Sequence, residues 1–259
     1  MNSEISKEIK QHGPNWDKLH NGYFSDPAIA ACLIKKIKSA IAISKPEVLI
    51  DLGGGTGFIL SELIKNNIPS AIRLVNIDLS GKQVENLKDS RIKIACGCIS
   101  DSKRSDADNE SKQFLFIMRS ALHYFGEAGL MPILQHLRSQ TKTGEFFIHQ
   151  TACFKNERDA ECLNDIYKLM GTGKWYPTVN HLSNVLENTG WAIKSVSPAP
   201  KLQLASDDLI KRYGLSKKIV SQIHSEIIKR YGQIEDVIST TSNGFCAYLH
   251  YKIYTCAAV

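Results

Sequence analysis

One stretch of the sequence, residues 48–60, limits the possible folds more than any other. Three apolar residues lead into Asp51, and four glycines follow within the five positions 53–57. An apolar pattern with helical spacing begins at Phe58, so the stretch predicts a buried strand, a tight turn and a helix start. Glycine is needed where the backbone bends with positive φ or where a ligand touches it. A unit of this kind binds a nucleotide-like ligand at the carboxyl end of the strand.

The spacing of the glycines separates two classes of ligand. A dinucleotide fingerprint that starts at Gly53 needs its third glycine at position 58, which is Phe58. The spacing present is G-x-G-x-G, and Asp51 precedes it. This pattern resembles the first motif of the class I S-adenosylmethionine-dependent methyltransferases, which Asp51, Gly53, Gly55 and Gly57 match position by position. The resemblance implies that the glycines let the backbone approach the cofactor and that Asp51 holds its ammonium end.

The segment 72–77 predicts a second strand, and it ends at Asp78-Leu79. Asp78 lies 25 residues after Gly53. A carboxylate at this point accepts hydrogen bonds from ribose hydroxyls in dehydrogenases and methyltransferases alike, or it caps the next helix without a ligand role. The resemblance places Asp78 on the ribose, and we include Leu79 among the cofactor-binding residues.

The third predicted strand, residues 91–98, departs from the family pattern. The family commonly has a Gly-Asp pair after this strand, where residues contact the adenine. Here Gly97 is followed by Cys98 and Ile99, so the acid is missing. The resemblance implies that Cys98 and Ile99 flank the adenine. Ser100, Asp101 or a backbone amide remain as alternatives for the polar contact.

A fourth buried strand, residues 114–118, leads into Arg119 and then into a Leu-His-aromatic stretch that resembles the family's strand exit. Strand ends on this edge line the crevice of a doubly wound sheet, so we expect Arg119 to face cofactor or substrate. Two roles are open for His123: it caps the following helix, or it lies near the substrate. His123 and His149, at the end of the fifth predicted strand, are the candidate general bases if the acceptor must lose a proton.

The element order predicts an α/β fold: a doubly wound, mostly parallel, seven-stranded Rossmann-like sheet with an antiparallel last strand, here placed at 245–254. We expect a single domain in four parts: an N-terminal helical lid (1–45), the Rossmann-like core (46–200), a helical insertion or cap (201–240) and the final strand (241–259). Tyr23 is either a cofactor-binding lid residue or a packing residue. The polar segment 101–113 predicts a solvated loop.

Charge and cysteine usage restrict partners and compartment. The 259 residues carry a formal charge of +6 and seven cysteines without a C-x-x-C pair, and neither a zinc spacing nor a membrane-spanning run occurs. We expect a cytoplasmic protein with no metal. The lysine-rich insertion is a substrate cap, a dimer surface or a nucleic-acid patch, or else a solvated helix face. We favour the solvated face over nucleic-acid binding, and a homodimer stays open.

These patterns predict S-adenosylmethionine-dependent methyl transfer to a small organic acceptor. The methyl group sits on a positively charged sulfur, so the protein mainly has to align the acceptor with the C–S bond. Two alternatives remain. One is an NAD(P)-dependent oxidoreductase, which Phe58 disfavours, and the other is a non-catalytic binding protein with a methyltransferase fold.

Overall fold

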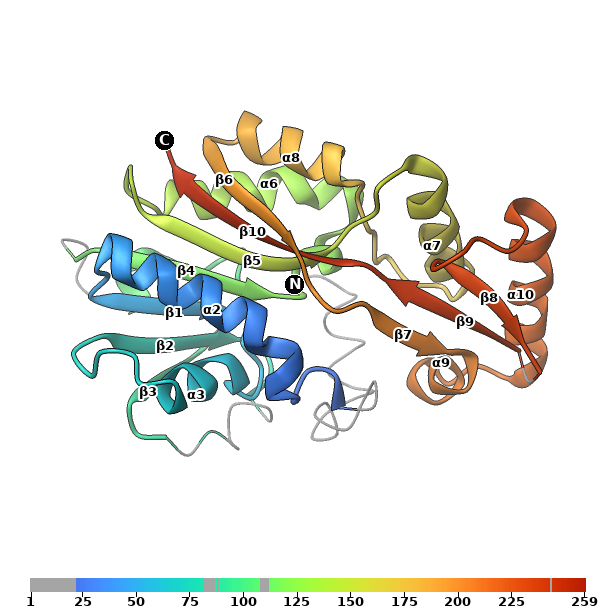
Figure 1. Ribbon diagram of the computed structural model, residues 1–259, viewed down its shortest axis with the longest axis horizontal. Coiled ribbons are helices and arrows are strands. Elements are labelled where there is room, and N and C mark those ends of the chain that lie inside the picture. The colour runs from blue at the N-terminus through green and yellow to red at the C-terminus, as the bar shows by residue number, and fades with distance from the viewer. Residues whose placement is uncertain (1–21, 82–86, 88, 108–111, 243) are drawn as a thin grey trace.

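The main sheet of the computed structural model has seven strands in the order β3-β2-β1-β4-β5-β10-β6 (Figure 1). The structure describes residues 22–81, 87, 89–107, 112–242 and 244–259. The strands are β1 (Val48–Leu52), β2 (Arg73–Asp78), β3 (Ile92–Cys96), β4 (Phe114–Arg119), β5 (Phe146–Ala152), β6 (Trp191–Pro198) and β10 (Tyr251–Ala258). β1 to β5 pair in parallel, whereas β10 pairs antiparallel with both β5 and β6. The predicted fold class is therefore confirmed.

Helices cover both faces of this sheet, which explains why the central strands are apolar throughout. On one face lie α2 (Pro27–Ser44) and α3 (Phe58–Lys65), and on the other lie α6 (Gly126–Ser139) and α8 (Val179–Asn188). All five residues of β1 are buried, as are the first five residues of β4. A parallel strand buried on both faces needs such a continuous apolar run.

The N-terminal part of the described chain packs on the sheet. α2 begins at the capping residue Asp26, whose Oδ1 accepts a 2.8 Å hydrogen bond from the amide of Ala28. Its apolar stripe, which includes Leu33 and Ile37, packs against β1 and β4. α2 is therefore a covering helix of the sheet, as its periodicity predicts. The rest of the expected lid, residues 1–21, lies outside the described residues.

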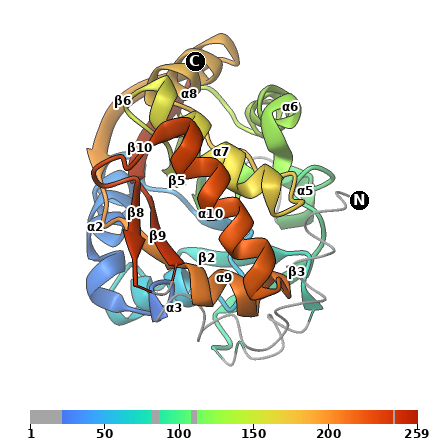
Figure 2. The same cartoon turned by 90° about the vertical axis from the view of Figure 1, so that its right-hand side faces the viewer.

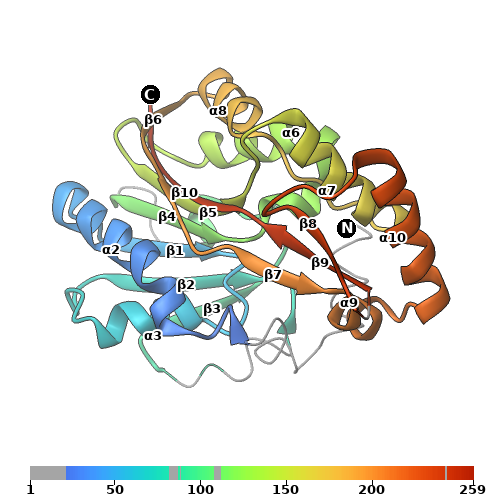
Figure 3. The ribbon, with the colours of Figure 1, turned by 45° about the vertical axis from the view of Figure 1, so that its right-hand side comes forward.

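The end of the chain differs from the prediction. The single strand expected at 245–254 is two strands, β9 (Gly244–Leu249) and β10, which separate at His250 and belong to different sheets. β9 forms a second sheet with β7 (Leu202–Ala205) and β8 (Ile238–Thr241) (Figure 3). β6 also leaves the main sheet beside this point, where Pro198 and Pro200 offer no amide donors for a ladder. The alternating pattern continues through the break, so the pattern alone does not reveal it.

The second sheet has its own helices. α9 (Ser206–Tyr213) and α10 (Lys217–Tyr231) pack on β9, and α10 also contacts α7 (Glu157–Leu169) (Figure 2). Together they bury a separate apolar cluster around Leu163, Ile227 and Phe245. The segment 201–240 is therefore a mixed helix and strand unit, whereas the sequence predicts helices alone. No helix among the described residues is long and apolar enough to cross a membrane.

The described part of the segment 101–113 also differs from the predicted solvated loop, while residues 108–111 lie outside the described residues. It contains the short helix α5 (Arg104–Ala107), and the guanidinium of Arg104 is buried. Arg104 lies there because two of its nitrogens donate to the fully buried carboxylate of Glu145, over 2.6 and 2.7 Å. Paired charge makes the burial of an arginine tolerable.

Candidate active site

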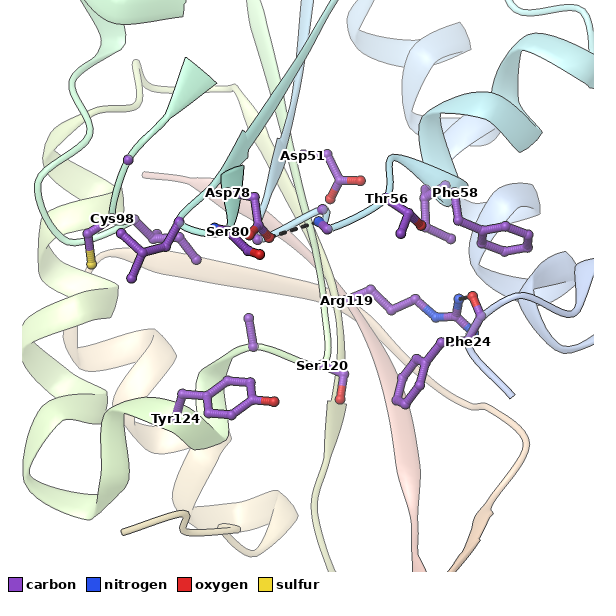
Figure 4. A pocket seen from close by; sticks show the side chains of 18 of the residues that line it. Phe24, Asp51, Thr56, Phe58, Asp78, Ser80, Cys98, Arg119, Ser120 and Tyr124 are labelled. Carbon is purple, nitrogen blue, oxygen red and sulfur yellow. Dashed lines mark hydrogen bonds between the residues drawn. The ribbon is translucent and has the colours of Figure 1, made fainter. Parts of the chain in front are cut away.

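A cleft opens at the carboxyl ends of β1, β2 and β4, beside the glycine turn (Figure 4). This is the crevice where open α/β sheets bind their ligands. Its lining comes from the segment before α2, the turn after β1, the ends of β2 and β3, and the exit of β4 with the short helix η2 (Leu122–Phe125). The lining residues are Phe24, Asp51, Gly53, Gly54, Gly55, Thr56, Phe58, Ile59, Asp78, Leu79, Ser80, Gly97, Cys98, Ile99, Arg119, Ser120, Ala121, Tyr124 and Phe125.

The glycine turn brings bare backbone to the floor of the cleft. Gly55 has φ +56°, a conformation that side chains disfavour. A Cβ on Gly54 would lie 2.2 Å from Oδ1 of Asn76 and 2.6 Å from the Asp51 carboxylate. Gly57 is the residue before α3 and lies outside the cleft lining. The turn thus has the shape that the sequence predicts, with three of its four glycines in contact with the cleft.

Asp78 sits opposite the turn and is held by two backbone amides. Its Oδ2 accepts a 2.8 Å hydrogen bond from Gly55, and its Oδ1 accepts one of 2.8 Å from Ser80. Burial raises the pKa of Asp78, and these two hydrogen bonds oppose the shift. Both oxygens are fixed at the cleft wall, and their remaining lone pairs suit a pair of hydroxyl donors.

Asp51 carries a buried carboxylate at the end of β1. The residue is 1% exposed, and neither oxygen has a hydrogen-bond partner among the described residues. Burial, followed by the nearby charge of Asp78, raises the pKa of Asp51 to about 7, and Arg119 lowers it in part. A buried carboxylate without a donor is costly, which makes it a place for a cationic ligand group.

Arg119 extends from the end of β4 across the cleft toward the segment before α2 (Figure 4). Its Nη1 donates to the carbonyl of Phe24 over 3.0 Å, and its Nη2 donates to the carbonyl of Tyr23 over 3.3 Å. Burial lowers the pKa of Arg119, whereas electrostatic interactions with Tyr23, Tyr251 and Asp51 raise it in part. The expected position of Arg119 facing the cleft therefore agrees with the structure.

The far end of the cleft lies at the end of β3. Gly97, Cys98 and Ile99 line it, as does Leu79. Ser100 and Asp101 are not among the lining residues, since Ser100 Oγ turns to Cys98 Sγ at 3.0 Å and Asp101 is exposed. The missing acid after Gly97 therefore has no replacement from these two side chains in the described cleft.

Neither histidine that we considered as a base lies in the cleft lining. His149 is fully buried between Phe147 and Tyr254, with ring centroids 4.7 and 4.9 Å away, and its Nδ1 is 2.7 Å from Thr151 Oγ1. Burial lowers the pKa of His149 to about 3. β5 is buried from Phe147 to Ala152, so His149 lies among core side chains.

His123 and Tyr23 are packing residues in this structure. His123 is buried, with Tyr124 and Tyr176 against its ring at 4.1 and 5.2 Å. Tyr23 is 4% exposed, stacks on Tyr251 at 5.6 Å and donates through its hydroxyl to the carbonyl of Pro200. Neither lines the cleft. Cofactor contact by Tyr23 and base catalysis by His123 stay predictions that this geometry does not favour.

Several residues that line the cleft are not among the site residues predicted from the sequence. Phe24, Thr56, Tyr124 and Phe125 all line the cleft. Tyr124 and Phe125 belong to the Leu-His-aromatic exit, so that motif carries a signal for them. Phe24 is one of the aromatic residues of the expected N-terminal lid, but its place in the cleft depends on a contact with β4, about 95 residues away in sequence.

No protein-family model matches the sequence, and no curated protein matches it. Solved structures do. A proposed methyltransferase from Bacillus halodurans C-125 is 11% identical with a TM-score of 0.65, over 86% of this chain and 97% of that one. Geranyl diphosphate C-methyltransferase from Streptomyces coelicolor A3(2), solved with Mg²⁺, geranyl diphosphate and S-adenosyl-L-homocysteine, is 12% identical with a TM-score of 0.54, over 88% and 79%.

The [4+2]-cyclase SpnF is 15% identical with a TM-score of 0.55, over 88% of this chain and 81% of that one. Proteins with different activities thus share this fold. Sequence identities of this size establish a common fold and nothing about a common activity. The strand order, the antiparallel β10 and the glycine turn at the carboxyl end of β1 agree with these comparisons. The chain has the fold of the class I S-adenosylmethionine-dependent methyltransferases.

Proposed function

We propose that this protein transfers the methyl group of S-adenosylmethionine to a small organic acceptor. The observation that carries the proposal is the pairing of bare backbone at Gly53–Gly55 with the fixed carboxylate of Asp78 across one cleft. The fold comparison supports the same cofactor class. In this proposal Asp78 accepts from the ribose hydroxyls, and Cys98 and Ile99 flank the adenine.

The buried Asp51 carboxylate fits the cofactor's cationic end. Both of its oxygens lack partners within the described chain, and an ammonium group would supply donors to them. The cofactor brings an activated methyl group on a positively charged sulfur. The residues of the cleft then have to hold the acceptor in line with the C–S bond and exclude water, which is catalysis by positioning.

The acceptor side of the cleft points to a small organic molecule. Phe24 and Tyr124 lie on the side of the cleft away from the glycine turn, with Ser120 as a polar group between them (Figure 4). Ligand sites for small molecules are mostly apolar with a few placed polar groups. Ser120 lines the cleft, and its Oγ lies 2.7 Å from Oη of the buried Tyr251; we assign the Ser120 hydroxyl as the polar contact to the acceptor. His149 has no such access, and we do not assign it a catalytic role.

Two alternative functions remain, and one observation bears on each. A nicotinamide-dependent oxidoreductase would place its pyrophosphate where Phe58 lines the cleft, and this side chain disfavours that function. A protein of this fold with another activity is the second alternative, since SpnF is named as a [4+2]-cyclase. We also retain two predictions: a reducing cytoplasmic compartment, which the seven free cysteines support, and a homodimer, which light scattering on the purified protein would test.

Binding and transfer assays separate these functions. Calorimetric titration with S-adenosylmethionine, S-adenosylhomocysteine and NAD should give binding for the first two only. Incubation of the protein and methyl-tritiated S-adenosylmethionine with a fractionated metabolite extract should then move label into a small acceptor. NAD binding without sulfonium binding would favour the oxidoreductase. Cofactor binding without any label transfer would favour a non-methylating protein of this fold.

A further inference from the structure

Arg119 connects the cleft to the segment that precedes α2. Its two terminal nitrogens donate to the main-chain carbonyls of Tyr23 and Phe24. Its guanidinium also lies 5.3 Å from the ring centroid of Phe24 and 5.8 Å from those of Tyr23 and Phe58. One side chain of β4 therefore holds a segment that is about 95 residues distant in the sequence.

The Nε donor of this side chain is not used by either of these contacts. The Nε of Arg119 is buried and has no hydrogen-bond partner within the part of the chain that the structure describes. Arginine presents its donors in a rigid planar fork that suits a carboxylate. A buried N–H without an acceptor costs free energy, so a ligand that provides an acceptor gains from binding here.

A second buried group, the carboxylate of Asp51, lies in the same cleft and has the opposite charge. The two oxygens of Asp51 are buried without partners, and the charges of Asp51 and Arg119 interact. They form no direct ion pair within the described residues, where each salt bridge joins other groups. A ligand end that carries both an ammonium and a carboxylate would satisfy both side chains at once. An α-amino acid group has this charge pattern.

We propose that Arg119 binds the carboxylate of the cofactor's amino-acid end and thereby fixes the segment Gly22–Asp26 over the cofactor. This inference rests on the proposed function. The bound carboxylate restrains the guanidinium, which in turn holds the carbonyls of Tyr23 and Phe24. Phe24 already lines the cleft, so a bound carboxylate would further restrain the side of the cleft that we assign to the acceptor.

A pair of ligands that differ only in the carboxyl group tests the contact. S-adenosylhomocysteine and its decarboxylated form, S-adenosyl-3-thiopropylamine, are titrated by calorimetry against the protein. We expect the wild type to prefer the carboxylate form by roughly 10-fold or more, as a charge-assisted contact gives. Arg119→Met should bring this ratio close to one, Arg119→Lys should keep part of it, and the exposed control Arg230→Met should keep all of it.

The outcomes separate the two proposals. If neither ligand binds the wild type, the proposed function fails. If both ligands bind the wild type equally, or if Arg119→Met keeps the full preference, the role of Arg119 is wrong and the proposed function stands. Should Arg119→Met fail to fold, Arg119→Lys decides, because a ratio that stays at the full wild-type value in this variant would also make the role of Arg119 wrong.

Hydrogen exchange on the wild type tests the link to the segment. The amide of Ser25 donates to the carbonyl of Gly22 over 2.9 Å, so its exchange reports on this turn. S-adenosylhomocysteine at saturation should slow exchange in residues 22–26 several-fold more than the decarboxylated ligand does. Equal protection by both ligands would show that the carboxylate does not act on the segment.

Discussion

The backbone amide of Gly55, in the turn after β1, donates a 2.8 Å hydrogen bond to Oδ2 of Asp78 at the end of β2. The bond joins the two elements that a nucleoside ligand would bridge, and it fixes the carboxylate before any ligand arrives. A binding group that is already oriented costs less free energy to use, because the protein loses little freedom on binding.

Asp78→Ala is expected to weaken the binding of S-adenosylhomocysteine by about 1–3 kcal/mol, because ribose hydroxyls would be buried without an acceptor. Calorimetry with the purified variant measures this. The matched control is Asp101→Ala, which removes an exposed carboxylate outside the cleft lining and should leave the affinity unchanged. An unchanged affinity in Asp78→Ala would place this residue outside the ligand site.

The ionisation of Asp51 should make stability depend on pH. Its folded-state pKa is about 7, against an ordinary value near 4 in the unfolded chain, so the folded state binds the proton more tightly. The stability of the ligand-free protein therefore falls as the pH rises from about 4 to 7. Asp51→Asn removes this dependence. The variant should gain stability relative to the wild type between pH 5 and pH 8, by up to about 4 kcal/mol from about three pKa units.

Denaturant unfolding at a series of pH values measures the effect of Asp51. Glu226→Gln, which changes an exposed carboxylate of α10, serves as the control and should follow the wild-type profile. A parallel profile for Asp51→Asn and the wild type would mean that Asp51 titrates at its ordinary pKa.

Two glycines of the cleft should respond differently to alanine. Gly54→Ala places a Cβ within 2.6 Å of the Asp51 carboxylate and closer still to Asn76, whereas a Cβ on Gly97 meets nothing within 4 Å. We expect Gly54→Ala to destabilise the fold by about 1–3 kcal/mol through overpacking and to lose ligand binding. Gly97→Ala should unfold at the wild-type midpoint. Similar thermal midpoints for both variants would contradict the packing described here.

The buried pair of Arg104 and Glu145 should contribute strongly to stability. The carboxylate of Glu145 accepts from both terminal nitrogens of Arg104 and from the amides of Phe114 and Lys142. Glu145→Gln removes the charge that Glu145 places against this buried guanidinium, and we expect a loss of about 3–5 kcal/mol in urea unfolding. The exposed carboxylate of Asp236 offers the comparison, since Asp236→Asn should leave the midpoint close to that of the wild type.

The parts of the cleft that lie at strand ends could be predicted from the sequence. The glycine turn at 53–57 and the carboxylate at 78 follow strands whose apolar runs are unmistakable, and parallel strands bring their carboxyl ends to one edge. The same rule predicts that Arg119 and the residues after Gly97 reach the cleft. These positions depend on strand ends, which sequence pattern locates well.

The roles of the histidines could not be predicted in the same way. The sequence puts His149 at a strand end, where a ligand contact is plausible. The structure buries it because the neighbouring β10 brings Tyr254 onto its ring, at an interplanar angle of 2°. That contact joins residues 105 positions apart, and no local pattern contains it.

The strand–turn–helix unit, the order of the main elements and the carboxylates beside the turn follow from the local sequence, because backbone sterics and hydrophobic periodicity act over a few residues. Three other features follow only from the packing of distant elements: residues 244–258 divide between two sheets, Arg104 is buried against Glu145, and Arg119 holds the carbonyls of Tyr23 and Phe24. Each of these depends on which distant group supplies a hydrogen bond or a charge. That choice is made when the elements pack together, since a buried polar group must find its partner wherever the fold places one.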